Sequence, residues 1–273
     1  MDLDAIPWPD FAGFEYKKWL ENLKPTDDGL YDYFDYPRVY PIITSRSCPY
    51  RCTFCFHPLG NKYRQRSMDS VIHELEVMIP KYRINLVNID DELFSYNAKR
   101  VYEFCDRLAI ISKNVSWDIK WICSMRVDGL DENLLITMRD AGCIGVGFGF
   151  ESYSASVLKS MKKAITPAQI KRAVDLTLKH HISSFSFFIF GDRAETLQTA
   201  RETLNFCKSI RCANIGLVHL SPYPGTEIYT YCIEKGIIQN KMDYIENNCA
   251  NVYRMSEKMN DVEYYHLNFA PLD

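Results

Sequence analysis

The sequence contains no apolar run approaching the roughly 20 residues that a membrane-spanning helix needs. Its beginning, Met1-Asp2-Leu3-Asp4, lacks the basic and apolar regions of a secretory signal peptide. There is also no excess of basic residues, because the formal net charge is −3, so the overall charge does not favour nucleic acid. These absences predict a cytoplasmic protein with no membrane and no nucleic-acid partner.

The bulk composition is that of a chain with a large folded core. The protein has 273 residues, of which 47% are hydrophobic and 25% are charged. This length suits one large domain or two small ones, and an α/β barrel often uses this much chain as a single domain.

Cysteine, by contrast, is abundant, with ten residues. In a cytoplasmic chain, cysteines are more often reduced thiols or metal ligands than disulfides. Seven of them are scattered, and we expect these to be core or incidental thiols: Cys105, Cys123, Cys143, Cys207, Cys212, Cys232 and Cys249. The last four could in principle hold a second metal cluster, but their spacing is loose.

The other three cysteines, Cys48, Cys52 and Cys55, form a C-x3-C-x2-C motif after the apolar run 39–43. Soft thiolates select zinc, copper(I) or iron–sulfur clusters. Three ligands in so short a loop would leave one iron of a [4Fe–4S] cluster without a protein ligand and free for a small molecule. The alternative is a structural zinc site completed by His57, although zinc modules usually bring their ligands as two separated pairs.

This motif, with the aromatic Phe54 directly before its third cysteine, resembles the hallmark of the radical S-adenosylmethionine (SAM) superfamily. The resemblance implies that the open iron binds the amino and carboxylate groups of SAM. An electron from the cluster then splits the sulfonium, and the 5′-deoxyadenosyl radical removes hydrogen from a substrate, here an unknown small molecule or peptide. The resemblance also implies an electron donor such as flavodoxin or ferredoxin. The cofactors carry this chemistry, and the protein positions them and excludes solvent.

Beyond residue 38, short β-rich runs alternate with amphipathic helical stretches. The predicted strands are 39–44, 85–89, 116–124, 143–150, 183–190 and 213–220. One predicted helix begins after Ser67 and ends at Pro80. Another begins at Pro167 and carries a stripe of Ile170, Val174, Thr177 and His181. The alternation predicts an α/β fold with a parallel sheet and outer helices, and the resemblance implies a partial (β/α)6 barrel.

Three regions are expected along the chain. Residues 1–38 form an N-terminal arm that is rich in aromatic residues and interrupted by prolines, and we expect it to dock on the main body. Residues 39–236 form the radical SAM core. Residues 237–273 form a C-terminal extension, which is polar and irregular.

The strand ends supply the candidate SAM-binding residues, because ligands in such folds gather beyond the carboxyl ends of the strands. After the second strand come Asp90 and Asp91, which the resemblance places against the SAM amino group; a solvated acidic turn is the alternative. After the third strand, Arg126 could hold a carboxylate, or it could pair structurally with Asp128.

The fourth strand carries Gly147 and Gly149, and glycine in a strand permits close approach of a ligand or another backbone. The resemblance places Glu151 near the SAM ribose or amino group. It also places Lys163 against the SAM carboxylate, although a surface position is the default for any single lysine. The sixth strand ends in a rigid turn at Pro222, where the family flanks the adenine.

Several segments are most similar to the catalytic part of the cobalamin-dependent radical SAM enzymes, many of which are methyltransferases: residues 63–67, 90–91, 149–152 and 222–226. The resemblance spans residues 39–236. No D-x-H-x-x-G signature of a cobalt-ligating histidine occurs, and the arm is too short for a cobalamin-binding domain. We therefore expect cobalamin only through a missing domain or a partner.

The resemblance makes methyl transfer the leading predicted outcome, and oxidation or rearrangement is the alternative. A hypothesis of a different class is a zinc-stapled binding protein without catalysis. The sequence does not identify the substrate, because substrate contacts come from loops that share no motif.

Overall fold

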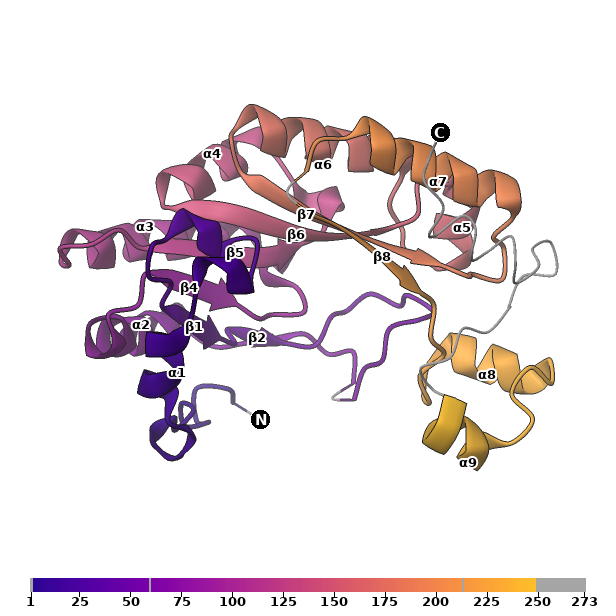
Figure 1. Ribbon diagram of the computed structural model, residues 1–273, viewed down its shortest axis with the longest axis horizontal. Helices are drawn as coiled ribbons and strands as arrows, with labels where there is room; N and C mark the ends of the chain where they lie inside the picture. Colours follow the sequence, from indigo (N-terminus) through magenta and orange to yellow (C-terminus); the bar gives the residue numbers. More distant parts are fainter. Residues whose placement is uncertain (1, 59, 213, 249–273) are drawn as a thin grey trace.

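A computed structural model describes residues 2–58, 60–212 and 214–248 of the chain (Figure 1). The described residues form eight strands: β1 (Val39–Ile42), β2 (Ser45–Arg46), β3 (Arg64–Gln65), β4 (Leu86–Ile89), β5 (Lys120–Met125), β6 (Cys143–Glu151), β7 (Ser183–Phe190) and β8 (Asn214–His219). They also form nine α-helices: α1 (Tyr16–Asn22), α2 (Met68–Tyr82), α3 (Ala98–Lys113), α4 (Glu132–Asp140), α5 (Ala155–Ser160), α6 (Pro167–Lys179), α7 (Leu197–Ser209), α8 (Glu227–Glu234) and α9 (Lys241–Asp243).

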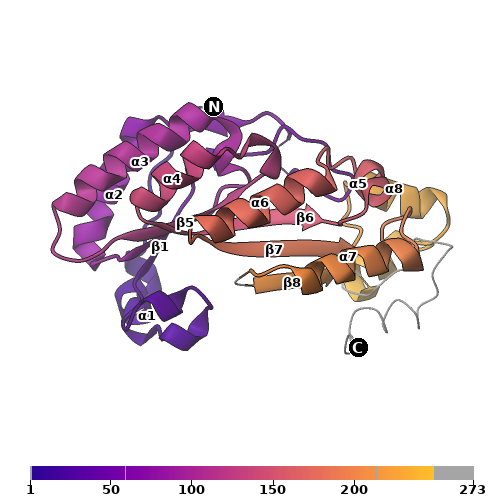
Figure 2. The ribbon, with the colours of Figure 1, turned by 90° about the horizontal axis from the view of Figure 1, so that it is seen from above.

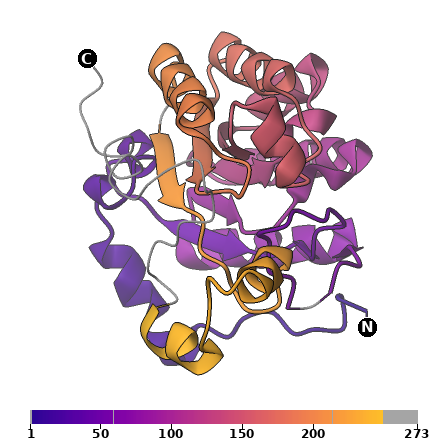
Figure 3. The same ribbon diagram turned by 90° about the vertical axis from the view of Figure 1, so that its right-hand side faces the viewer.

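Six of the strands form one parallel sheet in the order β1-β4-β5-β6-β7-β8, which is also their order in the chain. Successive strands are neighbours, as expected for repeated strand–helix units. The sheet does not close, since β1 and β8 are its two edges (Figure 3). The predicted α/β fold, with a parallel sheet in a partial (β/α)6 barrel, is confirmed.

The two faces of the sheet differ. Helices α2, α3, α4, α6 and α7 lie along its outer side (Figure 2). On that side Trp121, Phe148 and Phe188 are fully buried, and each buried side chain of this size contributes about 1.5–3 kcal/mol to folding. Residues that alternate with these along the same strands point to the concave side, where Ser124 of β5 and Phe187 of β7 are exposed. The core thus lies under the helices, and the concave face is left for a site.

The first strand is shorter than the predicted 39–44 and ends at Ile42. The backbone N–H of Thr44 donates to the Asp91 side chain at 2.6 Å, so it is withdrawn from the ladder between strands. A two-stranded antiparallel hairpin follows, in which β2 pairs with β3, and the sequence pattern did not predict it.

Ser67 is the N-cap of α2, as predicted, and its hydroxyl accepts a hydrogen bond from the N–H of Ser70 at 3.1 Å. The prediction that Pro80 ends this helix is wrong. Pro80 lies inside the last turn, and the helix continues to Tyr82. The actual end is Arg83, whose positive φ of 53° is the left-handed conformation common at helix C-termini.

The predicted stripe of α6 is correct for Ile170, Val174 and Thr177, which are buried, but wrong for His181. The helix ends at Lys179, and His181 is exposed with a φ of +57°. The buried histidine is His180, whose Nε2 lies 2.8 Å from the Glu132 carboxylate.

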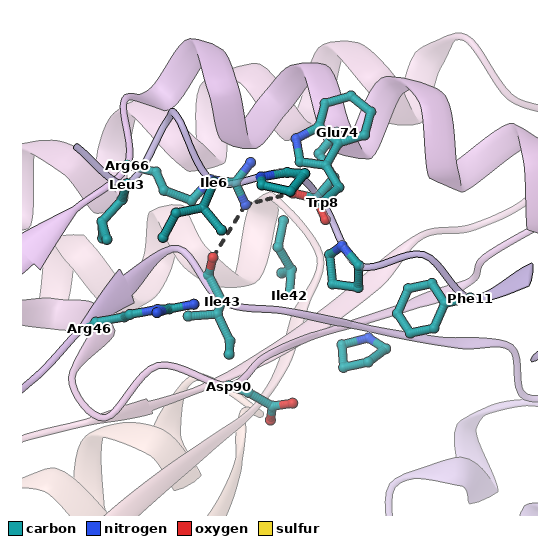
Figure 4. Close-up of a pocket in the computed structure, with 13 residues that line it drawn as sticks. Leu3, Ile6, Trp8, Phe11, Ile42, Ile43, Arg46, Arg66, Glu74 and Asp90 are labelled. Carbon is teal, nitrogen blue, oxygen red and sulfur yellow. Dashed lines mark hydrogen bonds and ion pairs between the residues drawn. The ribbon is translucent and has the colours of Figure 1, made fainter. Parts of the chain in front are cut away.

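The aromatic arm packs on the body along β1 and α2. Tyr16 is buried, stacks on Phe11 with 4.5 Å between ring centroids, and donates a hydrogen bond to the Val39 carbonyl. Figure 4 shows Trp8 of the arm beside the buried ion pair of Arg66 and Glu74, which a cavity of about 270 Å³ adjoins. Further along the arm, Leu30 is buried against the amino ends of β1 and β4.

Beyond the sheet, the chain forms a small second cluster rather than an irregular tail. Its buried members are Leu220, Ile228, Cys232, Ile238 and Tyr244. The predicted strand start at Ala213, the scattered Cys249 and the rest of the extension to residue 273 lie outside the described residues.

Candidate active site

The three cysteines of the motif lie in the loop between β2 and β3, which two later segments hold in place. The N–H of Thr53 donates to the carbonyl of Met161 at 3.0 Å, just after α5. The carbonyl of Thr53 accepts from the N–H of Ile228 at 3.0 Å, in the first turn of α8. The middle of the motif is therefore fixed between two helix ends that are distant in sequence.

The thiols of the motif are free, and Cys52 is buried while Cys48 and Cys55 are partly exposed. A hydrogen bond from the Cys55 thiol lowers the pKa of Cys52, and the same contact raises the pKa of Cys55. Burial raises the pKa of Cys48. The nearby cations Lys163 and Arg126 also favour the thiolate form of Cys52, and thiolate is the form that binds metal.

The donor set suits a cluster better than a single ion. Among the residues that the structure describes, no three His, Cys, Asp or Glu side chains are gathered closely enough to hold one metal ion. Zinc would need four donors about 2.0–2.3 Å from one centre. A four-iron cluster takes thiolates on separate irons, so the three cysteines of the motif fit such a cluster without a fourth protein donor.

His57, the fourth donor of the zinc alternative, follows Cys55 by two residues in the same loop. Both of its ring nitrogens are buried without a hydrogen-bond partner among the described residues, and its Nδ1 is 3.8 Å from the Glu92 carboxylate. Glu92 in turn accepts a hydrogen bond from the N–H of Ser47 at 3.2 Å.

Glu151 and Lys163 form a buried ion pair at the end of β6, with 2.7 Å between Lys163 Nζ and Glu151 Oε1. Glu151 has a φ of +63° at a register shift that follows Gly149, and this bulge aims its side chain. Burial lowers the pKa of Lys163, but the Glu151 carboxylate and the Cys52 thiolate together outweigh burial and raise it. The Lys163 ammonium also lies 6.0 Å from the centroid of the Phe54 ring, beside the third cysteine.

Gly149 of β6 makes room for the Glu151–Lys163 ion pair, and Gly147 makes room beside Ser124 and Phe187. A Cβ atom on Gly149 would lie 2.3 Å from Glu151 Oε1 and 3.0 Å from Lys163 Nζ, so this glycine accommodates the ion pair itself. A Cβ atom on Gly147 would meet the Ser124 hydroxyl at 3.2 Å and the Phe187 ring at 3.9 Å on the concave face.

Arg126 is engaged by protein groups at the end of β5. It pairs with Asp128, with Nε 3.0 Å from Oδ1, and donates to the carbonyl of Lys163 at 2.8 Å. Its guanidinium lies 3.6 Å from the centroid of Tyr50, whose hydroxyl donates to Asp128 at 3.0 Å. The structural pairing of Arg126 with Asp128, which was one alternative from the sequence, is thus present. Tyr50 also contacts both side chains, and the only sign of this in the sequence was that Tyr50 lies within the cysteine motif.

The two acids after β4 have different surroundings. Asp91 is buried and accepts four hydrogen bonds, of 2.5–2.9 Å, from the backbone N–H and hydroxyl groups of Thr44 and Ser45. Asp90 is exposed and accepts one hydrogen bond from the Asn88 amide at 2.8 Å. Asp91 therefore ties the ends of β1 and β4 together, and Asp90 is the more accessible carboxylate.

Pro222 follows β8, and its carbonyl accepts a hydrogen bond from the buried Tyr244 hydroxyl at 2.8 Å. The same turn reaches the cluster loop, because a Cβ atom on Gly225 would lie 3.3 Å from the Phe56 ring.

Sequence reasoning missed two buried acids in the turn after β7. The Asp192 side chain has an Oδ2 atom without a hydrogen-bond partner in the described part of the chain. Burial raises the pKa of Glu195 to about 8, and its carboxylate accepts a hydrogen bond from the N–H of Gly191. Their position at a strand end was the available signal, but two acids in a turn are ordinarily solvated.

No helix in the described part of the chain is long and apolar enough to cross a membrane.

Comparison with curated proteins gives relatives that are longer than this chain. An uncharacterized methyltransferase of Pyrococcus horikoshii is 33% identical over 199 residues, which cover 72% of this chain and 42% of the relative. An anaerobic magnesium-protoporphyrin IX monomethyl ester cyclase of Rubrivivax gelatinosus is 29% identical over 231 residues, covering 84% of this chain and 39% of the relative. The chain thus spans about two fifths of the length of these relatives.

Solved structures share the fold. The radical SAM methyltransferase TsrM of Kitasatospora setae, with cobalamin and a [4Fe–4S] cluster bound, has a TM-score of 0.67 at 22% identity, covering 77% of this chain and 39% of TsrM. The cobalamin-dependent radical enzyme OxsB, with aqua-cobalamin and SAM bound, has a TM-score of 0.68 at 17% identity, covering 88% of this chain and 41% of OxsB.

The sequence profile of the Radical SAM superfamily matches residues 42–207, more than half of the chain, including all three cysteines of the motif, Glu151 and Lys163. The match confirms the predicted enzyme type and the cofactor pair of that type, a [4Fe–4S] cluster with SAM. The chain belongs to the radical SAM superfamily.

Proposed function

We propose that this protein reductively cleaves SAM at a [4Fe–4S] cluster held by Cys48, Cys52 and Cys55, and that the reaction removes hydrogen from a substrate. The observation that carries the proposal is the fixed cysteine loop beside the buried pair of Glu151 and Lys163. When bound, the cluster and SAM supply the 5′-deoxyadenosyl radical. The chain supplies thiolates, charged groups and a water-poor surrounding.

Glu151 and Lys163 are the groups that would orient SAM. The methionyl part of SAM carries an ammonium and a carboxylate, and this pair presents the two complementary charges within 2.7 Å of each other. Hydrogen bonds to charged groups are among the stronger ones. We assign the SAM ammonium or ribose to Glu151 and the SAM carboxylate to Lys163, with Gly149 providing the space for both side chains.

The remaining candidates have supporting roles in this proposal. Phe54 lies along Lys163. Asp90 is the accessible acid for a cation after β4, whereas Asp91 acts through the fold, since Thr44 and Ser45 occupy its oxygens. Arg126 adds positive charge beside Cys52 and fixes the segment that carries Lys163.

Gly147 opens the concave face next to the SAM site, and Pro222 begins the turn that would flank the adenine. The proposed division of the chain follows from these roles. Residues 39–236 carry the catalytic core, residues 1–38 form the aromatic arm, and residues 237–273 form the C-terminal extension.

Methyl transfer is the proposed outcome. Its support is the similarity to an uncharacterized methyltransferase of Pyrococcus horikoshii and to two bacteriochlorophyllide d methyltransferases of Chlorobaculum tepidum. The similarity to an anaerobic ester cyclase favours an oxidative reaction as the second candidate. A cytoplasmic location and a reduced flavodoxin or ferredoxin as electron donor complete the proposal.

The test is anaerobic reconstitution with iron and sulfide, followed by incubation with SAM and dithionite. The wild type should hold about four irons and release 5′-deoxyadenosine. The triple variant Cys48→Ala/Cys52→Ala/Cys55→Ala should do neither, while Cys212→Ala, a cysteine outside the motif, should do both. A colourless protein that retains zinc at these cysteines would contradict the proposal.

A further inference from the structure

The concave face of the sheet carries an aromatic side chain in an unusual place. Phe187 is 45% exposed although it lies in the middle of β7, which is paired on both sides by β6 and β8. The neighbouring residues Ser186 and Phe188 point the other way and are fully buried. A large apolar side chain left open inside a fold is a feature of ligand sites rather than of cores.

Glycines of the two flanking strands determine how this ring lies. A Cβ atom on Gly216 of β8 would be 2.6 Å from Phe187 Cδ1, and a Cβ atom on Gly147 of β6 would be 3.9 Å from Phe187 Cε2. Cδ1 and Cε2 are on opposite sides of the ring. The ring therefore extends across the sheet from β8 toward β6, and it is partly exposed to the space above the sheet.

That space is a cavity of about 200 Å³, which Phe187 and Gly147 help to line together with Ser124 and Asn88. The arm contributes Asp28, Leu30 and Tyr31 to the lining of this cavity. The volume suits one or two fused rings and is below the range of about 300–1,000 Å³ of drug-sized sites.

The cavity lies directly below the proposed SAM site. Gly147 precedes Gly149 by two residues on the same face of β6, a separation of about 7 Å along a strand. Gly149 is the residue that accommodates the Glu151–Lys163 pair. A molecule in the cavity would therefore lie next to SAM bound at that pair.

The edges of the cavity are polar while its floor is apolar. The Ser124 hydroxyl makes no hydrogen bond with other residues of the described ranges, and the Asn88 amide donates to Asp90 at 2.8 Å. Flat rings prefer to stack on aromatic faces, and polar atoms on a ring's edge need partners when they are buried.

We propose that the cavity is the substrate site and that it takes a substrate with a planar, conjugated ring system of one or two rings. The ring stacks on Phe187, and its polar edge faces Ser124 and Asn88. Phe187 is thus a specificity-determining residue. The identification of this ring as the substrate rests on the proposed function, whereas the ring-binding site itself does not.

The site can be tested with a matched pair of probes, 2-naphthol and its saturated counterpart decahydro-2-naphthol, titrated against the cluster-loaded protein by isothermal titration calorimetry. We expect the planar probe to bind at least about tenfold more tightly than the saturated one. Phe187→Leu should weaken 2-naphthol about three- to tenfold, and Phe187→Tyr should preserve binding. Phe14→Leu, on the exposed arm, is the matched control and should change nothing.

Three results would overturn the inference: equal binding of the two probes, undiminished binding of 2-naphthol by Phe187→Leu, or loss in Phe14→Leu equal to that in Phe187→Leu. A fourth is competitive displacement of 2-naphthol by SAM, which would assign the ring face to the adenine of SAM. Formation of 5′-deoxyadenosine is measured on the same preparations. Absence of that product with normal, Phe187-dependent probe binding would refute the proposed function and leave a ring-binding site of another purpose.

Discussion

At the scale of single residues, Glu151 and Lys163 form the most consequential charge pair of the described chain. Their side chains are only 7% and 10% exposed, so both charges are removed from water. The desolvation of such a pair offsets much of its attraction, and its presence is weak evidence of stabilisation. Since the fold could replace the pair with apolar residues at little cost, its placement beside the cysteine loop points to ligand binding.

Removing one partner of this pair should be costly. Lys163→Met leaves the Glu151 carboxylate buried without its cation, and we expect a loss of about 3–5 kcal/mol in the free energy of unfolding, measured with urea. The double variant Lys163→Met/Glu151→Gln should regain a large part of this loss. Lys171→Met, which breaks an exposed pair with Asp175, should cost at most about 0.5 kcal/mol. Equal losses in the single and double variants would contradict a direct interaction.

Glu195 predicts a pH dependence of stability. Burial, aided by the charge of Asp192, raises the pKa of Glu195 to about 8 from an ordinary value of 4.5. The folded state therefore keeps a proton that the unfolded chain releases, and this contribution to stability is complete below about pH 4.5 and lost as the pH rises to about 8. Relative to wild type, Glu195→Gln should gain roughly 1–3 kcal/mol at pH 8 and nothing at pH 4.5.

Urea unfolding at a series of pH values measures this difference. Glu76→Gln, which changes an exposed acid of α2, is the control and should follow the wild-type curve. A difference between Glu195→Gln and wild type that stays constant with pH would show that folding does not raise the pKa of Glu195.

At the scale of the elements, strands and long helices could be predicted from the sequence because their patterns are long. The strand Ser183–Phe190 has its predicted bounds, and all six strands of the sheet were expected. The two-residue strands β2 and β3 and the six-residue helix α5 could not be predicted, since such short segments carry no period. The end of β1 depends on Asp91, a side chain 47 residues away from Thr44, which no local pattern reveals.

For the candidate site as well, local features could be predicted from the sequence and contacts between distant segments could not. The spacing of Cys48, Cys52 and Cys55 is local, and it is visible in the sequence. The pairing of Arg126 with Asp128 was one of two alternatives beforehand. The hydrogen bonds of Asp91 with Thr44 and Ser45 are made by tertiary packing and were not among its alternatives. The exposure of Phe187 could not be predicted, because Gly216 and Gly147, the glycines beside its ring, lie on two other strands.

At the end of β6, the shape of the strand can be tested without removing a charged group. Gly149→Ala would bring a methyl group within 2.3 Å of Glu151 Oε1 and 3.0 Å of Lys163 Nζ, so the ion pair must shift. We expect SAM affinity, measured by equilibrium dialysis, to fall by roughly tenfold or more, equivalent to the loss of a charged hydrogen bond of about 1.5–3 kcal/mol.

The visible absorbance of the iron–sulfur cluster should be unchanged in the Gly149→Ala protein. The cysteine loop is held by backbone hydrogen bonds of Thr53 with Met161 and Ile228, and Gly149 takes no part in them. Gly129→Ala, whose added methyl group meets only the Ser95 carbonyl at 3.9 Å, is the matched control. Normal SAM affinity in the Gly149→Ala protein would show that Gly149 is not needed for SAM binding.

At the scale of the whole molecule, the site is assembled from parts that are far apart in the chain. The cysteine loop follows β1 and β2, the ion pair follows β6, and the clamp on Thr53 comes from α8, beyond the last strand of the sheet. Such contacts exist only after the open barrel has formed. Cluster binding should therefore be linked to the folding of the whole sheet, not to the loop alone.

The arm gives the last prediction, which is that this 273-residue chain alone does not bind cobalamin tightly. Cobalamin-binding domains are Rossmann-like and need a parallel sheet of their own. Residues 2–38 contain one short helix, α1, with single-turn segments and no strand, and Trp8, Phe11 and Tyr16 of the arm pack against the main core. Of the histidines nearest to the arm, His73 is exposed and packs edge-on against Trp8, and His57 lies in the cluster loop.

The measurement mixes the apo-protein with hydroxocobalamin, removes free corrin by gel filtration and records the visible spectrum. We expect less than about one tenth of a corrin per chain, since a single exposed histidine offers cobalt no buried surface to accompany it. The variant His73→Ala is the control for adventitious ligation and should retain equally little. Stoichiometric retention would mean that the arm and the barrel mouth form a corrin site by themselves, and methyl transfer would then need no second chain.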